Sequence, residues 1–215
     1  MKRSAFIQDL DRYRWNNPRL PRWVVLLTIH GAQATLVYRF GHWIYTHVQR
    51  KNPLWWLAVV VYYLMRWVVQ VVTGISISPR ADIGPGFYIG HFGSIVIGGQ
   101  VKMGSNCNIS HEVTIGAFGR ELDQQSPKIG HRVYIAPGAK VFGGIEIGDD
   151  AAIGANAVVP RSAPPRAVMV GVPAKMISSK GSFDLVCYFD MDKDADRLLS
   201  MSQADKDNGS NENIA

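Results

Sequence analysis

An aliphatic residue recurs at every sixth position between residues 77 and 159, and no other feature constrains the fold as strongly. A helix repeats every 3.6 residues and a half-buried strand every second residue, so neither explains this spacing. A solenoid does, because a chain that turns a corner every six residues points one aliphatic side chain inward on each of three faces, and eighteen residues close one coil. These positions are Ile77, Ile83, Ile89, Ile95, Val101, Cys107 and Val113, and then Ile129, Ile135, Val141, Ile147, Ile153 and Val159.

Glycine often follows the aliphatic residue directly, as it does at Gly84, Gly90 and Gly130, and tight corners favour glycine. A β-sandwich would show turn signals at wider and irregular intervals. The sequence therefore predicts a mainly β solenoid over residues 75–177, preceded by an α-helical region over residues 1–74. Residues 178–215 are polar and acidic, and we expect a largely disordered tail there.

The helical region is unusually basic. Residues 1–80 contain eleven Lys and Arg against two Asp, a net of nine positive charges, and they hold all six tryptophans of the chain. A basic, tryptophan-rich, apolar segment suits a membrane interface. It equally suits helices that pack on the solenoid or on another subunit. No recognised nucleic-acid-binding motif accompanies the basic residues, so nucleic acid is not an expected partner.

Residues 54–72 form the most apolar stretch, with only Arg66 and Gln70 strongly polar. Its nineteen residues are close to the ~20 that a membrane-spanning helix needs. Such a helix can span a membrane, lie on it or pack against protein, and the charge of Arg66 disfavours spanning. Two cysteines, Cys107 and Cys187, do not make a disulfide framework and indicate a reducing cytosol. The first eleven residues lack the pattern of a signal peptide.

The hexads are interrupted between Val113 and Ile129. Residues 116–128 include Gly119, Arg120 and Pro127, a composition typical of a loop that leaves the solenoid. Loops on a rigid scaffold commonly carry function. We therefore expect this loop to contribute to a site.

Five segments carry a resemblance to known proteins: ISPRADIG (77–84), GHFGSIVIG (90–98), VTIG (113–116), PKIG (127–130) and GVPAK (171–175). They resemble the hexapeptide-repeat acyltransferases, and within them the bacterial serine acetyltransferases and their polysaccharide-modifying relatives. The resemblance covers residues 74–175. It implies a left-handed parallel β-helix, assembly as a homotrimer, and acetyl-coenzyme A bound along the groove between adjacent solenoids. The handedness comes from the resemblance alone.

His91 matches the catalytic histidine of that family. A neutral imidazole can take the proton of an acceptor hydroxyl while its oxygen attacks the thioester carbonyl, so no covalent enzyme intermediate is required. His111 follows twenty residues later, on the same face one coil further but displaced by two positions. It is either a second active-site residue or a partly buried, hydrogen-bonded histidine. Ser76 and Glu112 are candidates to support His91.

The resemblance also implies residues for the acetyl donor. The positions that match the family's lining of the pantetheine arm are Gly116, Ala117, Pro137, Gly138 and Ala155, and Lys175 suits a phosphate of coenzyme A. The small residues suit the corners of the coils equally well.

Zinc deserves consideration, because solenoids that resemble the γ-class carbonic anhydrases hold this metal with three histidines. His91, His111 and His131 are evenly spaced here. A spacing of twenty residues does not stack them in one column, and we expect no metal.

Two departures from the serine acetyltransferases bear on the acceptor. Those enzymes carry an Asp before the Ile-x-Pro that opens the solenoid, where this chain has Ser76, and an Arg-His pair before Pro-Lys-Ile, where it has Gln125 and Ser126. Zwitterionic serine needs a cation for its carboxylate, whereas a neutral sugar does not.

The sequence thus predicts an acetyl-coenzyme A-dependent O-acetyltransferase that acts on a sugar hydroxyl in exopolysaccharide, capsule or envelope glycan biosynthesis. Its place would be the cytoplasm, at the inner face of the cytoplasmic membrane, and Arg120, Gln124 and Gln125 would contact the carbohydrate. Two alternatives remain open: a serine O-acetyltransferase of cysteine biosynthesis, and a non-catalytic, membrane-associated trimeric scaffold.

Overall fold

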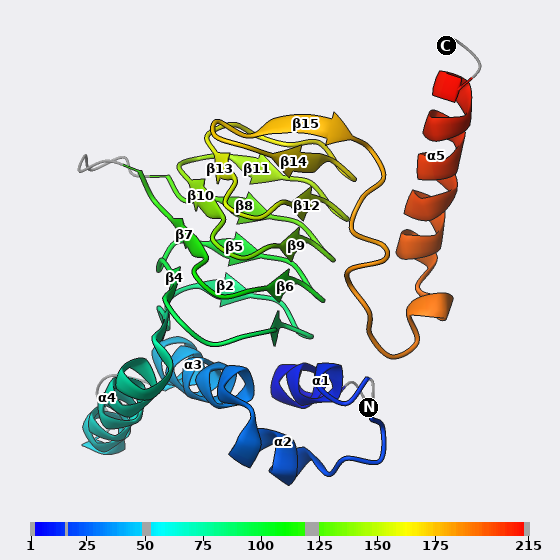
Figure 1. Cartoon of the computed structure of the whole chain (residues 1–215). Coiled ribbons are helices and arrows are strands. Elements are labelled where there is room, and N and C mark those ends of the chain that lie inside the picture. The colour runs from blue at the N-terminus through cyan, green and yellow to red at the C-terminus, as the bar shows by residue number, and fades with distance from the viewer. Residues whose placement is uncertain (1–2, 16, 49–52, 119–124, 213–215) are drawn as a thin grey trace.

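The computed structural model describes residues 3–15, 17–48, 53–118 and 125–212 of the 215-residue chain. Short strands stack into a three-sided solenoid, with four helices at its N-terminal end and a fifth beside it (Figure 1). The predicted mainly β solenoid behind an α-helical region is confirmed, and so is the left-handed parallel β-helix that the resemblance implies.

Each face of the solenoid is a parallel sheet with one strand from each coil. The first face contains β1 (Ile75–Ile77), β4 (Ile95–Ile97), β7 (Thr114–Gly116), β10 (Lys140–Phe142) and β13 (Val158–Val159). The second face contains β2 (Asp82–Ile83), β5 (Lys102–Met103), β8 (Lys128–Ile129) and β11 (Glu146–Ile147). The third face contains β3 (Tyr88–Ile89), β6 (Asn108–Ile109), β9 (Tyr134–Ile135), β12 (Ala152–Ile153), β14 (Val168–Val170) and the antiparallel β15 (Lys175–Ser178).

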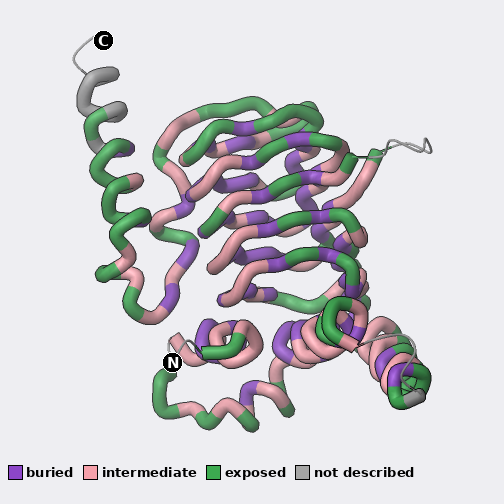
Figure 2. The backbone as a smooth tube through the Cα atoms, turned by 180° about the vertical axis from the view of Figure 1, so that it is seen from behind, coloured by how far each residue is buried: buried purple, intermediate pink, exposed green. Residues whose placement is uncertain are grey.

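The core is filled by pairs of inward side chains. Ile75 and Ile77 on β1 are both buried, and Ala81 and Ile83 form the corresponding pair on the second face. Figure 2 shows this alternation of buried and exposed residues along successive coils. Each six-residue segment therefore offers two core positions, two residues apart, where the sequence predicts one.

The first coil contains twenty residues, where the sequence predicts eighteen. Ile77 pairs with Ile97 and Ile89 pairs with Ile109, twenty residues later in each case. Ile97 then pairs with Ile115 after eighteen. The two extra residues lie between Ile89 and Ile97, so the predicted positions from Ile95 to Val113 occupy the other inward position of each strand. From Ile129 onward the predicted positions return to the column that begins at Ile77, Ile83 and Ile89, because Ile129 pairs with Met103 and Ile135 pairs with Ile109. The prediction of one column is therefore wrong only from Ile95 to Val113, where both inward positions are apolar and a slip of two residues leaves the period unbroken.

The N-terminal helices are α1 (Ala5–Arg12), α2 (Arg22–Thr28), α3 (His30–His47) and α4 (Pro53–Thr73). Helices α3 and α4 pack through a cluster that includes Val37, Ile44, Trp55 and Tyr62. Gly41 permits this approach, because a Cβ atom there would lie 2.2 Å from the Tyr62 ring. The two helices therefore form one packed pair.

Arg39 of α3 ties the helices to the first coil. It donates to the carboxylate of Asp9 on α1 at 2.8 and 3.1 Å, and to the carbonyls of Ile83 and Gly84 at 2.6 and 2.7 Å. The backbone N–H of Phe87 donates to Asp9 at 2.8 Å. This buried joint fixes α1 and α3 against the coil that begins the solenoid.

The C-terminal segment covers the third face. Asn108 on β6 donates to the carbonyl of Leu185 at 3.1 Å, and the Ser182 hydroxyl donates to the carbonyl of Arg132 at 2.5 Å. A 3-10 helix, η1 (Met191–Lys193), then leads into α5 (Ala195–Glu212). The expectation of a largely disordered tail is wrong for this segment. The polar composition of the segment does not indicate the few contacts that hold it. One of them is the hydrogen bond from the buried Arg197 to the carbonyl of Val186.

Candidate active site at the histidine corner

The chain turns from the third face to the first face along one edge of the solenoid, here called the histidine corner. His91 lies on it between β3 and β4, and His111 lies on it between β6 and β7. Because Ile89 pairs with Ile109, the two histidines occupy equivalent positions of adjacent coils. The predicted displacement by two positions is wrong, because the two extra residues of the first coil remove it.

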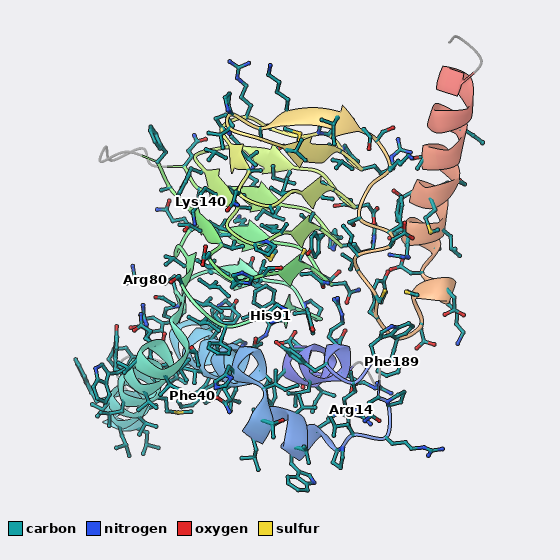
Figure 3. The ribbon with its side chains drawn as sticks, viewed as in Figure 1. Arg14, Phe40, Arg80, His91, Lys140 and Phe189 are labelled. Carbon is teal, nitrogen blue, oxygen red and sulfur yellow. The ribbon has the colours of Figure 1, made fainter. Side chains whose placement is uncertain are left out.

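The structure brings the two imidazole rings together. Their centroids are 5.7 Å apart and their planes meet at 79°. His91 is exposed and lies on the first coil, close to the helices (Figure 3). His111 is half-buried, and its Nδ1 is buried without a hydrogen-bond partner. The pair thus combines a solvent-facing ring with a sheltered one.

The backbone around the histidines is held in a strained conformation. Ser94 and Glu112 have positive φ angles of 49° and 59°, which are unfavourable for residues with a Cβ atom, whereas Gly93 adopts its φ of 112° without strain. The Gly93 carbonyl accepts from the N–H of Glu112 at 2.8 Å, and Lys140 donates to the Glu112 carbonyl. Strain of this kind persists only where surrounding contacts enforce it. The Glu112 side chain itself is exposed.

The sequence does not predict that Lys140 and the helical region contribute to this corner. The ring of His30, at the start of α3, lies 4.6 Å from the ring of Phe92, which directly follows His91. The sequence does not connect the two rings, because sixty-two residues separate His30 from Phe92. The helices therefore help to position the corner that carries His91.

Three of the predicted donor residues continue the histidine corner. Ile109 pairs with Ile135 and Ile135 with Ile153, so Pro137 and Ala155 occupy the positions of His111 in the next two coils. The N–H of Gly138 donates to the His111 carbonyl at 3.0 Å. With about 4.8 Å between strands, Ala155 lies about 14 Å along the edge from His91. Small residues thus line the edge beyond the histidines.

The other predicted donor residues lie elsewhere. Gly116 ends β7 and Ala117 follows it, at the far edge of the first face. A Cβ atom at Gly116 would meet nothing within 4 Å, so the surface is open there. Lys175 is exposed at the start of β15, which pairs with the last strand of the third face.

Ser76 does not join the histidine pair in the structure. Its hydroxyl accepts from Nε2 of Gln70 at 2.8 Å and from Nη2 of Arg66 at 3.5 Å, both on α4. The side chain is therefore engaged by the helix that precedes the solenoid.

The loop over residues 116–128 leaves the solenoid at another edge, where the first face turns into the second; we call it the loop corner. Arg120 and Gln124 lie outside the described residues. Gln125 is exposed and borders a shallow cavity of about 500 Å³. Lys102 and Lys128 also line this cavity, and Lys128 pairs with Glu146 at 2.8 Å. Cations are thus present beside Gln125.

The third histidine of the sequence series stands apart. His131 lies on the remaining edge of the solenoid, where its Nδ1 accepts from the N–H of Ser105 at 3.0 Å. Within the described ranges, no group of three or more His, Cys, Asp and Glu side chains is arranged to hold a metal ion.

Comparison with known proteins identifies the family. Residues 126–161 match the model of the bacterial transferase hexapeptide repeat (six repeats). A serine acetyltransferase of Mycobacterium tuberculosis is 37% identical over 187 residues, which cover 84% of this chain and 78% of the relative.

Two solved structures are similar. The serine acetyltransferase of Neisseria gonorrhoeae has a TM-score of 0.69 and 31% identity, covering 81% of this chain and 65% of the other, slightly less than two thirds. A serine acetyltransferase in complex with CoA has a TM-score of 0.66 and 29% identity, covering 80% and 68%.

These relatives contradict the sugar acceptor predicted from the sequence, since they are serine acetyltransferases. The prediction rested on the loss of a basic pair at Gln125 and Ser126. The cavity beside these positions holds another cation, Lys102, whereas Lys128 is paired with Glu146. The predicted acyltransferase class is confirmed. The chain belongs to the serine acetyltransferase family of hexapeptide-repeat acyltransferases.

Proposed function

We propose that the protein transfers the acetyl group of acetyl-coenzyme A to the hydroxyl of serine, with His91 as general base. One observation carries this proposal: the exposed His91 ring lies in register beside His111, at the start of an edge lined by small residues. The names of the relatives, and the solved structure in complex with CoA, support the two substrates.

In the proposed reaction the His91 imidazole takes the proton of the serine hydroxyl while that oxygen attacks the thioester carbonyl carbon. A carbon–oxygen bond forms and the carbon–sulfur bond breaks. The imidazolium then returns the proton to the departing sulfur, so the products are O-acetylserine and coenzyme A. One imidazole serves both transfers, because its ring nitrogen can accept a proton and then donate it.

His111 is proposed as the positioning residue for His91. The Asp expected for this role in the family is Ser76 here, and α4 engages its hydroxyl. The ring of His111 is the neighbour that the structure does place against His91. Replacement by Gln should lower kcat and move the pH profile of kcat, whereas a purely structural role would lower only the melting temperature.

The substrates are assigned to two edges of the solenoid. Pro137, Gly138 and Ala155 would line the pantetheine arm along the histidine corner, with Lys175 toward a phosphate. Lys102 and Gln125 at the loop corner would meet the serine carboxylate and its surroundings, because a carboxylate favours cationic and hydrogen-bonding partners.

The active assembly is proposed to be a homotrimer. The histidine corner and the loop corner lie on opposite edges of the first face, so one copy does not bring them together by its strands alone. Adjacent solenoids would close the site by placing the loop corner of one copy against the histidine corner of the next. A cytoplasmic location agrees with the two free cysteines.

The test is an acetyl-transfer assay with purified full-length protein, acetyl-coenzyme A and serine. It follows thiol release and identifies O-acetylserine by mass. His91→Ala should lower kcat/KM by about 10²–10⁴-fold. His131→Ala is the matched control, because that histidine lies on a different edge, and it should retain activity.

Full activity of folded His91→Ala would refute the mechanism, and thiol release that does not depend on serine would refute the acceptor. Coenzyme A should also raise the melting temperature, as a ligand that binds only the folded state does. No such shift would favour the scaffold alternative.

A further inference from the structure

Helix α4 turns one side to the protein and leaves most of its circumference uncovered. Trp55 and Tyr62 are buried against α3, and Met65 and Val69 pack beside them. Only 17% of the apolar window over Leu54–Thr73 is buried, and by length and composition this helix could cross a membrane. The uncovered side chains, between 40% and 68% exposed, are Leu54, Trp56, Leu57, Val60, Val61, Tyr63, Leu64, Trp67, Val68, Val71 and Val72, here called the α4 face.

No charge interrupts the α4 face. Arg66 is the only charged residue in Leu54–Thr73, and both Arg66 and Gln70 reach toward Ser76 on β1. Their polar groups thus lie on the side of α4 that faces the protein. A continuous apolar surface of this kind is rare on soluble monomers and marks an interaction site.

The neighbouring helices extend the apolar character. Trp23 and Leu27 on α2 are 66% and 68% exposed, and Trp43 on α3 is 50% exposed. All these helices gather at the same end of the solenoid (Figure 1). Tryptophan and tyrosine side chains prefer the boundary between lipid and water, and Trp56, Tyr63 and Trp67 supply both types on α4.

The positive charge of the helical region decides between two possible partners of the α4 face. Residues 1–80 carry a net of nine positive charges. A second copy of the chain would bring an equally basic segment against the first, whereas an anionic lipid surface is complementary to it. We propose that the α4 face docks on an anionic phospholipid bilayer and holds the enzyme at the membrane surface.

The helix lies along the bilayer surface and does not span it. Gly74, with a φ of 69°, leads from α4 directly into β1, and Gly41 holds α4 close to α3. Arg39 in turn binds α3 to the first coil. A spanning α4 would pull Arg39 and His42 of α3 into the hydrocarbon, which is costly for charged and polar groups. An amphipathic helix with its apolar side in the interface avoids this cost.

Vesicle flotation of the full-length chain tests the proposal. The probes are phosphatidylcholine vesicles with and without about 30% phosphatidylglycerol. The protein should float with the anionic vesicles and less with the neutral ones. Trp67→Glu and Leu64→Glu should each weaken binding roughly tenfold or more, because each removes a large apolar side chain from the interface. Leu199→Glu on α5 is the matched control, since Leu199 is 61% exposed outside the α4 face, and it should float like the wild type.

Acetyl transfer is measured on the same samples, so a failed docking proposal is distinguished from a failed catalytic one. Unchanged flotation of Trp67→Glu would overturn the proposal. So would a smaller oligomer of Trp67→Glu in lipid-free buffer, because a second copy would then cover the face. Should the variants not fold, brominated lipids must quench the tryptophan fluorescence of the wild type, and an absence of quenching would overturn the proposal as well.

Discussion

The buried ion pair between Asp9 and Arg39, which joins the helices to the first coil, predicts a specific loss of stability when it is broken. The side chain of Asp9 is 1% exposed and that of Arg39 is 12% exposed. Arg39→Met would leave the Asp9 carboxylate buried with the N–H of Phe87, and would remove the donor to the carbonyls of Ile83 and Gly84. Breaking one half of a buried ion pair costs about 3–5 kcal/mol. At about 2–4 °C per kcal/mol for a chain of this size, the melting temperature should fall by about 6–20 °C.

The pH dependence of that loss has a definite sign. Burial raises the pKa of Asp9 above its ordinary value against the opposing effect of Arg39, and removal of the guanidinium raises the pKa further. An acid whose pKa is higher in the folded chain than in the unfolded chain destabilises when ionised. The defect of Arg39→Met should therefore be largest near neutral pH and should shrink as the pH falls through the folded-state pKa.

Calorimetry and urea unfolding across pH measure both effects. Asp9→Asn combined with Arg39→Met should recover part of the loss, because the buried charge is gone. Lys128→Met is the matched control: its ion pair with Glu146 is exposed, and the melting temperature should not change. A loss below about 1 kcal/mol for Arg39→Met at neutral pH would refute the reasoning.

Three further outcomes are expected. Ile135→Ala should lower the free energy of unfolding by about 2–5 kcal/mol, whereas Val96→Ala on the outer side of the first face should leave urea unfolding nearly unchanged. Cys187 should react with a thiol reagent at pH 8 long before Cys107, because burial raises the pKa of Cys107 to about 12; equal rates in the folded protein would contradict this. Gly41→Val should lower the melting temperature and weaken flotation, and a variant that keeps both would disprove the close packing of α3 on α4.

The solenoid could be predicted because its core repeats locally. Each hexad buries its own aliphatic residues against the coils above and below, so the period in the sequence reports the architecture directly. The slip of two residues after Ile89 could not be seen, since Ile95 and Ile97 are both buried and either satisfies the period. Only strand pairing distinguishes them.

The sequence also does not predict the contacts between distant segments, for a different reason. His30 and Phe92 are sixty-two residues apart, and nothing in either neighbourhood indicates that their rings meet. The polar C-terminal segment likewise has no period, and its attachment depends on side chains such as Ser182 and Arg197 that bond to backbone carbonyls. The prediction of a sugar acceptor rests on Gln125 and Ser126 alone, and the loop sequence does not indicate that Lys102 of a neighbouring strand lines the same cavity.

Both insertions into the hexads lie at the edges of the first face, and their positions connect the repeat to the proposed site. Two extra residues between Ile89 and Ile97 form the strained corner of His91 and align it with His111. The longer insertion between Ile115 and Ile129 forms the loop at the opposite edge. Neither insertion is needed to form a regular coil, because each adds backbone whose ordering costs conformational entropy without adding core contacts. Where local rules are broken in this way, a site is the expected reason, and the two insertions form the two corners that we propose to meet between adjacent copies.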